Sequence, residues 1–139
     1  RVLYGLRRYR ELLVELCDQV GLGDPERLHD TGRVAIDGVS VTLLYDDAVD
    51  EQRVFAFADL GLPHALTNEG ELRRLLAWNL KLDVVRDGVF GIHPASGRAV
   101  LRYEMHLDVV PDGLALANEL AGLAERAVRW RTRFEQANA

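Results

Sequence analysis

The segment 86–107 constrains the fold of this chain more than any other stretch. A short apolar run precedes the turn 94–97, and apolar residues then alternate with polar ones at Ala99, Leu101, Tyr103, Met105 and Leu107. Period-two alternation on both sides of a Pro/Gly turn predicts a β-hairpin. Because one face of such strands is apolar, the rest of the chain must supply elements that cover it.

Three helices and three further strands surround this hairpin in the predicted order. Apolar spacings of three and four residues predict helices near residues 3–20 and 114–134. A capping pattern, Asn68 with Glu71, predicts the start of another helix over 69–82. The period changes to two between residues 33 and 61, which predicts three strands, the first two joined at Asp37-Gly38.

The segment 21–32 is predicted to be a loop, because Gly21, Gly23 and Pro25 stop the first helix. The order α-β-β-β-α-β-β-α predicts an α+β fold with a mainly antiparallel, twisted sheet packed by helices. A length of 139 residues suits one domain, so residues 1–139 are expected to form a single domain.

The composition argues against several classes of partner. A net charge of -5 disfavours nucleic acid. No apolar run approaches the roughly 20 residues that a membrane span needs, so membrane insertion is not expected. Cys17 is the single cysteine, which excludes an internal disulfide and fits the cytosol.

No residue pattern points firmly to catalysis or to a bound cofactor. The four histidines lack metal-ligand spacing, so no metal site is expected, and no glycine-rich phosphate loop is present. His93 lies just before the turn 94–97 and Ser96 lies within it, so a catalytic pair can be imagined there, but Ser-Gly is typical turn chemistry. We therefore predict no catalytic residue and no cofactor.

Surplus apolar surface is the remaining functional signal. The strand 53–60 has apolar residues on both faces, and its small, smooth face is either open to a partner or covered by the chain's own helices. Apolar residues of the helix 69–82 spread over more than one stripe, which implies two packing partners. These residues are Leu72, Leu75, Leu76, Trp78, Leu80 and Leu82.

The chain resembles the class I type III secretion chaperones of the Tir-chaperone family. The resemblance covers nearly the whole order of elements, and its most specific residues are Trp78-Asn79-Leu80 and the hairpin from Phe90 to Leu101. It implies a non-enzymatic chaperone of the bacterial cytosol that forms homodimers. It also implies binding to the N-terminal, extended segment of a secreted effector, which stays soluble and export-competent, with the export ATPase as a further candidate partner.

The same resemblance implies roles for individual residues. The second long helix and the first strand of the hairpin would form the dimer interface, through Leu72, Leu75, Leu76, Trp78, Phe90 and Ile92. The effector groove would lie on the sheet, with Leu44, Val54, Ala56, Ala58 and Leu60.

Two alternative functions stay open at the level of sequence. One is a small α+β enzyme or ligand-binding domain that uses the turn with His93 and Ser96. The other is a structural or regulatory adaptor of the secretion system with the same fold, which only its partner would distinguish.

Overall fold

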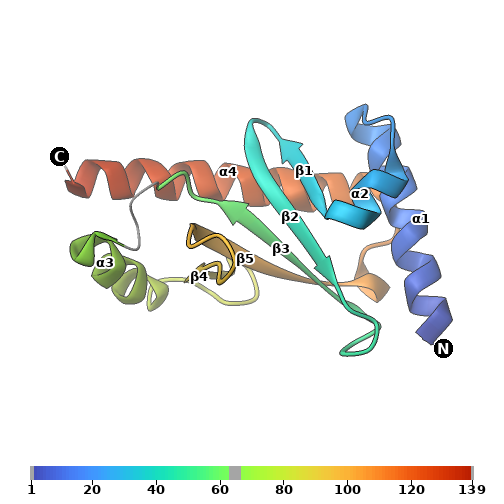
Figure 1. The fold of residues 1–139 in the computed structure, drawn as a ribbon, viewed down its shortest axis with the longest axis horizontal. Helices are drawn as coiled ribbons and strands as arrows, with labels where there is room; N and C mark the ends of the chain where they lie inside the picture. Colours follow the sequence, from blue (N-terminus) through green and yellow to red (C-terminus); the bar gives the residue numbers. More distant parts are fainter. Residues whose placement is uncertain (1, 63–66, 139) are drawn as a thin grey trace.

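The computed structural model describes residues 2–62 and 67–138, and its elements confirm the predicted α+β class (Figure 1). The helices and strands follow in the order α1 (Val2–Val20), α2 (Pro25–Thr31), β1 (Arg33–Ile36), β2 (Val39–Tyr45), β3 (Arg53–Asp59), α3 (Glu69–Asn79), β4 (Val89–Ile92), β5 (Ala99–His106), the 3-10 turn η2 (Leu107–Val109) and α4 (Gly113–Asn138). None of the described helices is long and apolar enough to cross a membrane.

The strands form one five-stranded sheet in the order β1-β2-β3-β5-β4, with every neighbouring pair antiparallel. The hairpin predicted for residues 86–107 is present as β4 and β5, with Phe90 opposite Leu101. The turn Asp37-Gly38 joins β1 to β2, and both of its residues have the positive φ, 49° and 80°, that a tight hairpin turn requires. The order places β1 and β4 at the two edges of the sheet.

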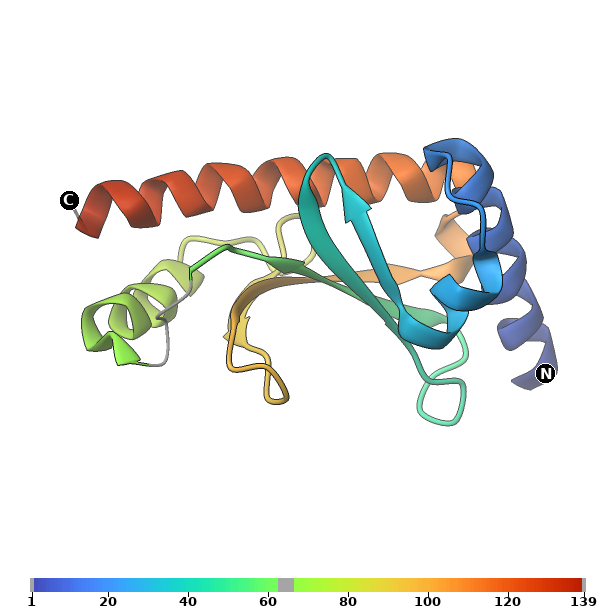
Figure 2. The ribbon, with the colours of Figure 1, turned by 45° about the horizontal axis from the view of Figure 1, so that its top comes forward.

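The helix α4 runs along one face of the sheet, and α1 closes one end of it (Figure 2). We call the face beneath α4 the inner face and the opposite one the outer face. The alternating apolar residues of β5 lie on the inner face, as predicted, and Leu101 is fully buried there. The Tyr103 hydroxyl donates a hydrogen bond to Glu119 Oε2 of α4 at 2.5 Å. Burial of this face supplies most of the free energy that holds the sheet against α4.

The predicted loop over residues 21–32 is wrong, because Pro25–Thr31 forms the helix α2. Asp24 caps this helix by accepting a hydrogen bond from the Arg27 amide at 3.0 Å, and Pro25 occupies its first turn. Gly32 ends it in the left-handed conformation, with φ of 68°. The short helix carries Leu28 into the core at 2% exposure.

The long helices differ slightly from their predicted bounds. α3 ends at Asn79 rather than at residue 82, and α4 continues to Asn138 rather than to residue 134. α3 lies against the end of α4 through an aromatic cluster of four side chains. They are Trp78, Phe90, Trp130 and Phe134, with ring centroids 4.5–5.7 Å apart in the observed pairs.

Candidate functional site

The turn with His93 and Ser96 uses both side chains to hold its own backbone. His93 Nδ1 accepts a hydrogen bond from the Ala95 amide at 3.2 Å, and Ser96 Oγ accepts one from the Arg98 amide at 3.3 Å. The structure shows no hydrogen bond between His93 and Ser96, so it brings no nucleophile to a base there. Within residues 2–62 and 67–138, no group of three His, Cys, Asp or Glu side chains is placed to hold a metal ion.

Four of the five residues predicted for the effector groove lie on the inner face instead of on an open surface. Val54, Ala56, Ala58 and Leu60 are at most 3% exposed and belong to the core. The expectation that this strand face is open is therefore wrong. The reason is geometric, since small side chains on the central strand β3 let α4 pack closely on the sheet.

Leu44 is the fifth predicted residue, and it lies on the outer face with 51% of its surface exposed. Opposite residues of an antiparallel pair share a face, so the pairing of Leu44 with Phe55 and of Thr42 with Phe57 places both phenylalanines beside it. The alternation along β3 places Phe55 and Phe57 on the strand face opposite to Ala56 and Ala58. The alternation alone does not show which of the two faces the helices cover.

Two arginines lie against the Phe55 ring, and a histidine lies against Phe57. The guanidinium carbons of Arg53 and Arg102 lie 4.9 Å and 4.5 Å from the centroid of the Phe55 ring, which is cation–π geometry. His93 meets the edge of Phe57 with ring centroids 5.6 Å apart. The outer face is thus an aromatic surface bordered by cations.

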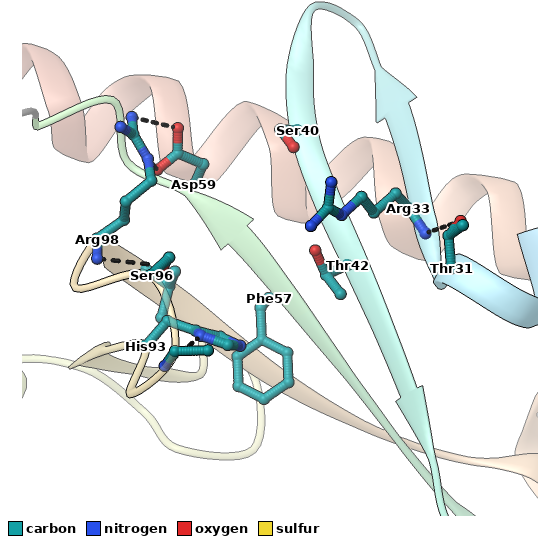
Figure 3. Close-up of a pocket in the computed structure, with 11 residues that line it drawn as sticks. Thr31, Arg33, Ser40, Thr42, Phe57, Asp59, His93, Ser96 and Arg98 are labelled. Atoms are coloured by element: carbon teal, nitrogen blue, oxygen red, sulfur yellow. Dashed lines mark hydrogen bonds and ion pairs between the residues drawn. The ribbon is translucent and has the colours of Figure 1, made fainter.

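The outer face contains a cavity of about 480 Å³ between β1, β2, β3 and the β4–β5 turn (Figure 3). On one side Arg98 makes a paired contact with Asp59, at 3.0 Å from Nε and 2.8 Å from Nη2. This contact raises the pKa of the Arg98 guanidinium above its ordinary value. On the other side Arg33 lies beside the hydroxyls of Ser40 and Thr42.

A second cavity, of about 420 Å³, adjoins the first at the edge strand β1. Thr31 and Arg33 line both cavities, and Leu22 and Leu28 contribute apolar walls to the second. Because the two cavities meet at Thr31 and Arg33, we refer to them together as the groove. It runs from the β4–β5 turn across β1 to the loop between α1 and α2.

The residues predicted for the dimer interface divide into covered and exposed groups. Leu75 and Phe90 are 4% and 5% exposed because their own chain covers them, and Leu72, Trp78 and Ile92 are half-buried against the core. Leu76 alone of the predicted set is largely exposed, at 73%. Leu80, Val84 and Val85 extend this apolar surface beyond α3, with exposures of 90%, 59% and 83%.

Comparison with solved structures finds a similar chain in the crystal structure of the ExsC-ExsE complex. The two chains superpose with a TM-score of 0.69 and are 24% identical, over 91% of this chain and 92% of the other. This likeness concerns the fold. A search of curated proteins finds no match.

The model of one protein family matches residues 11–131, from within α1 to near the end of α4. The match therefore includes the whole sheet, α3 and the groove on the outer face. The chain belongs to the Tir chaperone protein (CesT) family.

Proposed function

We propose that this chain is a type III secretion chaperone that binds the N-terminal segment of a cognate effector and keeps it soluble and export-competent in the bacterial cytosol. The observation that carries the proposal is the outer face, which lies opposite to α4 (Figure 2). On this face Leu44 is 51% exposed, and Phe55 and Phe57 are only half-buried. Membership in a chaperone family supports it. So does the fold that the chain shares with a component of the ExsC-ExsE complex.

The shape of the outer face suits an extended chain better than a folded domain. The groove is long and open, and β1 lies at a sheet edge where a further strand can add through backbone hydrogen bonds. An extended segment would place alternate side chains on the aromatic surface. Because an effector held in this way is not folded at that segment, it remains ready for export.

The second part of the proposal is a homodimer formed through α3 and the residues that follow it. The surface with Leu76, Leu80, Val84 and Val85 is apolar and continuous in sequence, and such surfaces on small proteins mark association sites. It lies at the α3 end of the molecule, away from the groove edge at β1 (Figure 1). A second copy bound there would leave the groove free, although Val84 and Val85 adjoin the outer face at Arg102.

The export ATPase is proposed as the destination of the loaded chaperone. The glycines at 88, 91 and 97 lie in β4 and its flanking turns, not in a strand-to-helix phosphate loop. The energy for unfolding and export would thus come from a partner. Binding of the ATPase to the complex, but not to free effector, tests this step.

Co-expression with proteins encoded nearby tests the proposed function. One of them should co-purify, and limited proteolysis should show protection of its N-terminal segment. Phe57→Asp should abolish co-purification, because the new carboxylate would lose hydration beneath an apolar segment. A protected segment elsewhere in the partner, or co-purification undiminished by F57D, would contradict the proposal.

The matched control is Leu114→Asp, which adds the same charge at an exposed site on α4. It should leave co-purification unchanged. Circular dichroism should confirm that both variants remain folded.

A further inference from the structure

The outer face carries an excess of positive charge in a protein whose net charge is -5. The described residues of its strands and of the β4–β5 turn include four arginines and only two carboxylates. They are Arg33, Arg53, Arg98 and Arg102 against Asp59 and Glu104. A bound segment with negative charge would therefore be favoured over a basic one.

Three of the four arginines are already engaged. Arg98 is paired with Asp59 at 2.8 Å, and Arg53 lies 3.8 Å from Glu104. Arg102 stacks on the Phe55 ring. Arg33 differs, because its exposed guanidinium makes no ion pair within the described part of the chain.

Arg33 lies beside two hydroxyl groups of the neighbouring strand. It is directly opposite Thr42 in the β1–β2 register, and Ser40 lies two residues along the same strand face. Figure 3 shows the guanidinium of Arg33 next to both side chains. A guanidinium and two hydroxyls together offer the hydrogen-bond donors that a carboxylate ligand requires. The carboxylates that line the two cavities have other partners, since Asp59 pairs with Arg98 and Asp24 accepts from the Arg27 amide.

The position of Arg33 indicates what kind of molecule carries that carboxylate. Arg33 and Thr31 line both cavities, so a ligand at this point continues into each of them. On one side it meets Phe57, which pairs with Thr42, and on the other side it meets Leu22, which is 40% exposed. Apolar contacts on both sides of a charged centre suit a peptide better than a small anion.

We propose that Arg33, with Ser40 and Thr42, recognises an aspartate or glutamate side chain in the extended segment bound along the groove. This inference rests on the proposed function, since it names a feature of the segment that the chaperone binds. Arg33 is then a specificity-determining residue, while Phe57 and Leu22 bind the flanking apolar side chains.

The test uses three fluorescein-labelled peptides of about twelve residues, roughly 40 Å long when extended. They share a background of alternating Val and Ser and differ only in a central Glu, Gln or Lys. Fluorescence polarisation with the full chain should show the Glu peptide binding about tenfold more tightly than the Gln peptide, as expected for a charge-assisted pair. The Lys peptide should bind more weakly than either.

Arg33→Gln should remove the preference for Glu while leaving the affinity for the Gln peptide unchanged. Arg33→Lys, which keeps the charge but loses the planar fork, should retain only part of it. Arg129→Gln is the matched control, because Arg129 is on α4 and pairs with Glu125 at 3.7 Å. It should keep the full preference.

The possible outcomes separate this inference from the proposed function. Equal binding of the Glu and Gln peptides, or a Glu preference that survives in R33Q, would overturn the role of Arg33 and leave a peptide-binding chaperone. Failure of all three peptides to bind would overturn the inference as well. Co-purification of an effector would then decide separately whether the proposed function stands.

Discussion

The side chain of Asn79 pairs with both backbone polar groups of Phe90, as a neighbouring strand would. Its Nδ2 donates to the Phe90 carbonyl at 3.0 Å, and its Oδ1 accepts from the Phe90 amide at 2.6 Å. Since β4 is an edge strand, these backbone groups have no strand partner on that side. Asn79 thus joins the end of α3 to the sheet and closes part of the β4 edge.

Asn79→Ala should lower the free energy of unfolding by about 1–2 kcal/mol, because it leaves a partly buried backbone donor and acceptor unpaired. Asn79→Asp replaces the donor with a carboxylate oxygen that repels the Phe90 carbonyl oxygen, so its loss should be at least as large as that of N79A. Urea denaturation followed by circular dichroism measures both values. Equal stability of N79A and the parent chain would show that solvent replaces the side chain at this edge.

Leu76→Asp and Leu80→Asp should each dissociate the proposed dimer, because a charge would be buried against apolar surface. We expect the dissociation constant of the dimer to rise at least about 100-fold. Both side chains are mostly exposed in the single chain, so neither change should unfold it. Sedimentation velocity over a concentration series measures the effect, with L114D as the control on α4. A dimer that persists in both variants would locate the interface elsewhere.

Gly32→Ala should destabilise the chain more than Gly21→Ala. Both glycines have positive φ, 68° and 75°, so both variants carry the strain of about 1 kcal/mol for an alanine in that conformation. A Cβ at Gly32 would also collide with the Leu43 carbonyl oxygen, whereas one at Gly21 has no described atom within 4 Å. The expected costs are about 1 kcal/mol for G21A and about 2–4 kcal/mol for G32A. Equal midpoints in thermal unfolding would contradict this difference.

The stability of the fold should decline at alkaline pH as Tyr103 ionises. Burial, followed by the hydrogen bond to Glu119, raises the pKa of Tyr103 to about 12 in the folded chain. A tyrosine in the unfolded chain has a pKa of about 10, so the unfolded state loses its proton at a lower pH than the folded state does. The stabilisation is fully present below pH about 10 and is lost as the pH rises from there through about 12.

Tyr103→Phe should make the decline in unfolding free energy shallower across that pH window. Tyr9, whose pKa burial also raises, should account for part of the decline that remains. Denaturation curves at a series of alkaline pH values measure both slopes. Identical slopes for Y103F and the parent chain would assign the whole effect to other groups.

The sequence pattern predicted most of the fold because its signals are local. The turn at Asp37-Gly38, the alternation in β5 and the cap at Asn68 each depend on residues a few positions apart. The sequence does not predict the helix α2, because Asp24-Pro25 indicates the end of one helix and is equally suited to start the next. Seven residues show too little periodicity to separate the two interpretations.

The candidate site was harder to predict, because it depends on which sheet face the helices cover. Both faces of β3 are apolar, so the pattern of Phe55, Ala56 and Phe57 allows either orientation. Packing decides, since alanines on the central strand admit a long helix that phenylalanines would exclude. No sequence motif identifies Arg33 as a binding residue. Its role depends on the pairing of β1 with β2, which places Thr42 beside it.

The aromatic cluster between α3 and α4 contains both tryptophans of the chain, Trp78 and Trp130. Arg133 lies 5.9 Å from the first ring and 5.0 Å from the second. Intrinsic fluorescence therefore originates from one end of the molecule, next to the exposed leucines of α3, while the outer sheet face contains no indole in its described part. Tryptophan emission should change when the chain self-associates and should change little when a peptide without tryptophan binds in the groove. One unlabelled sample can therefore distinguish the two events by fluorescence.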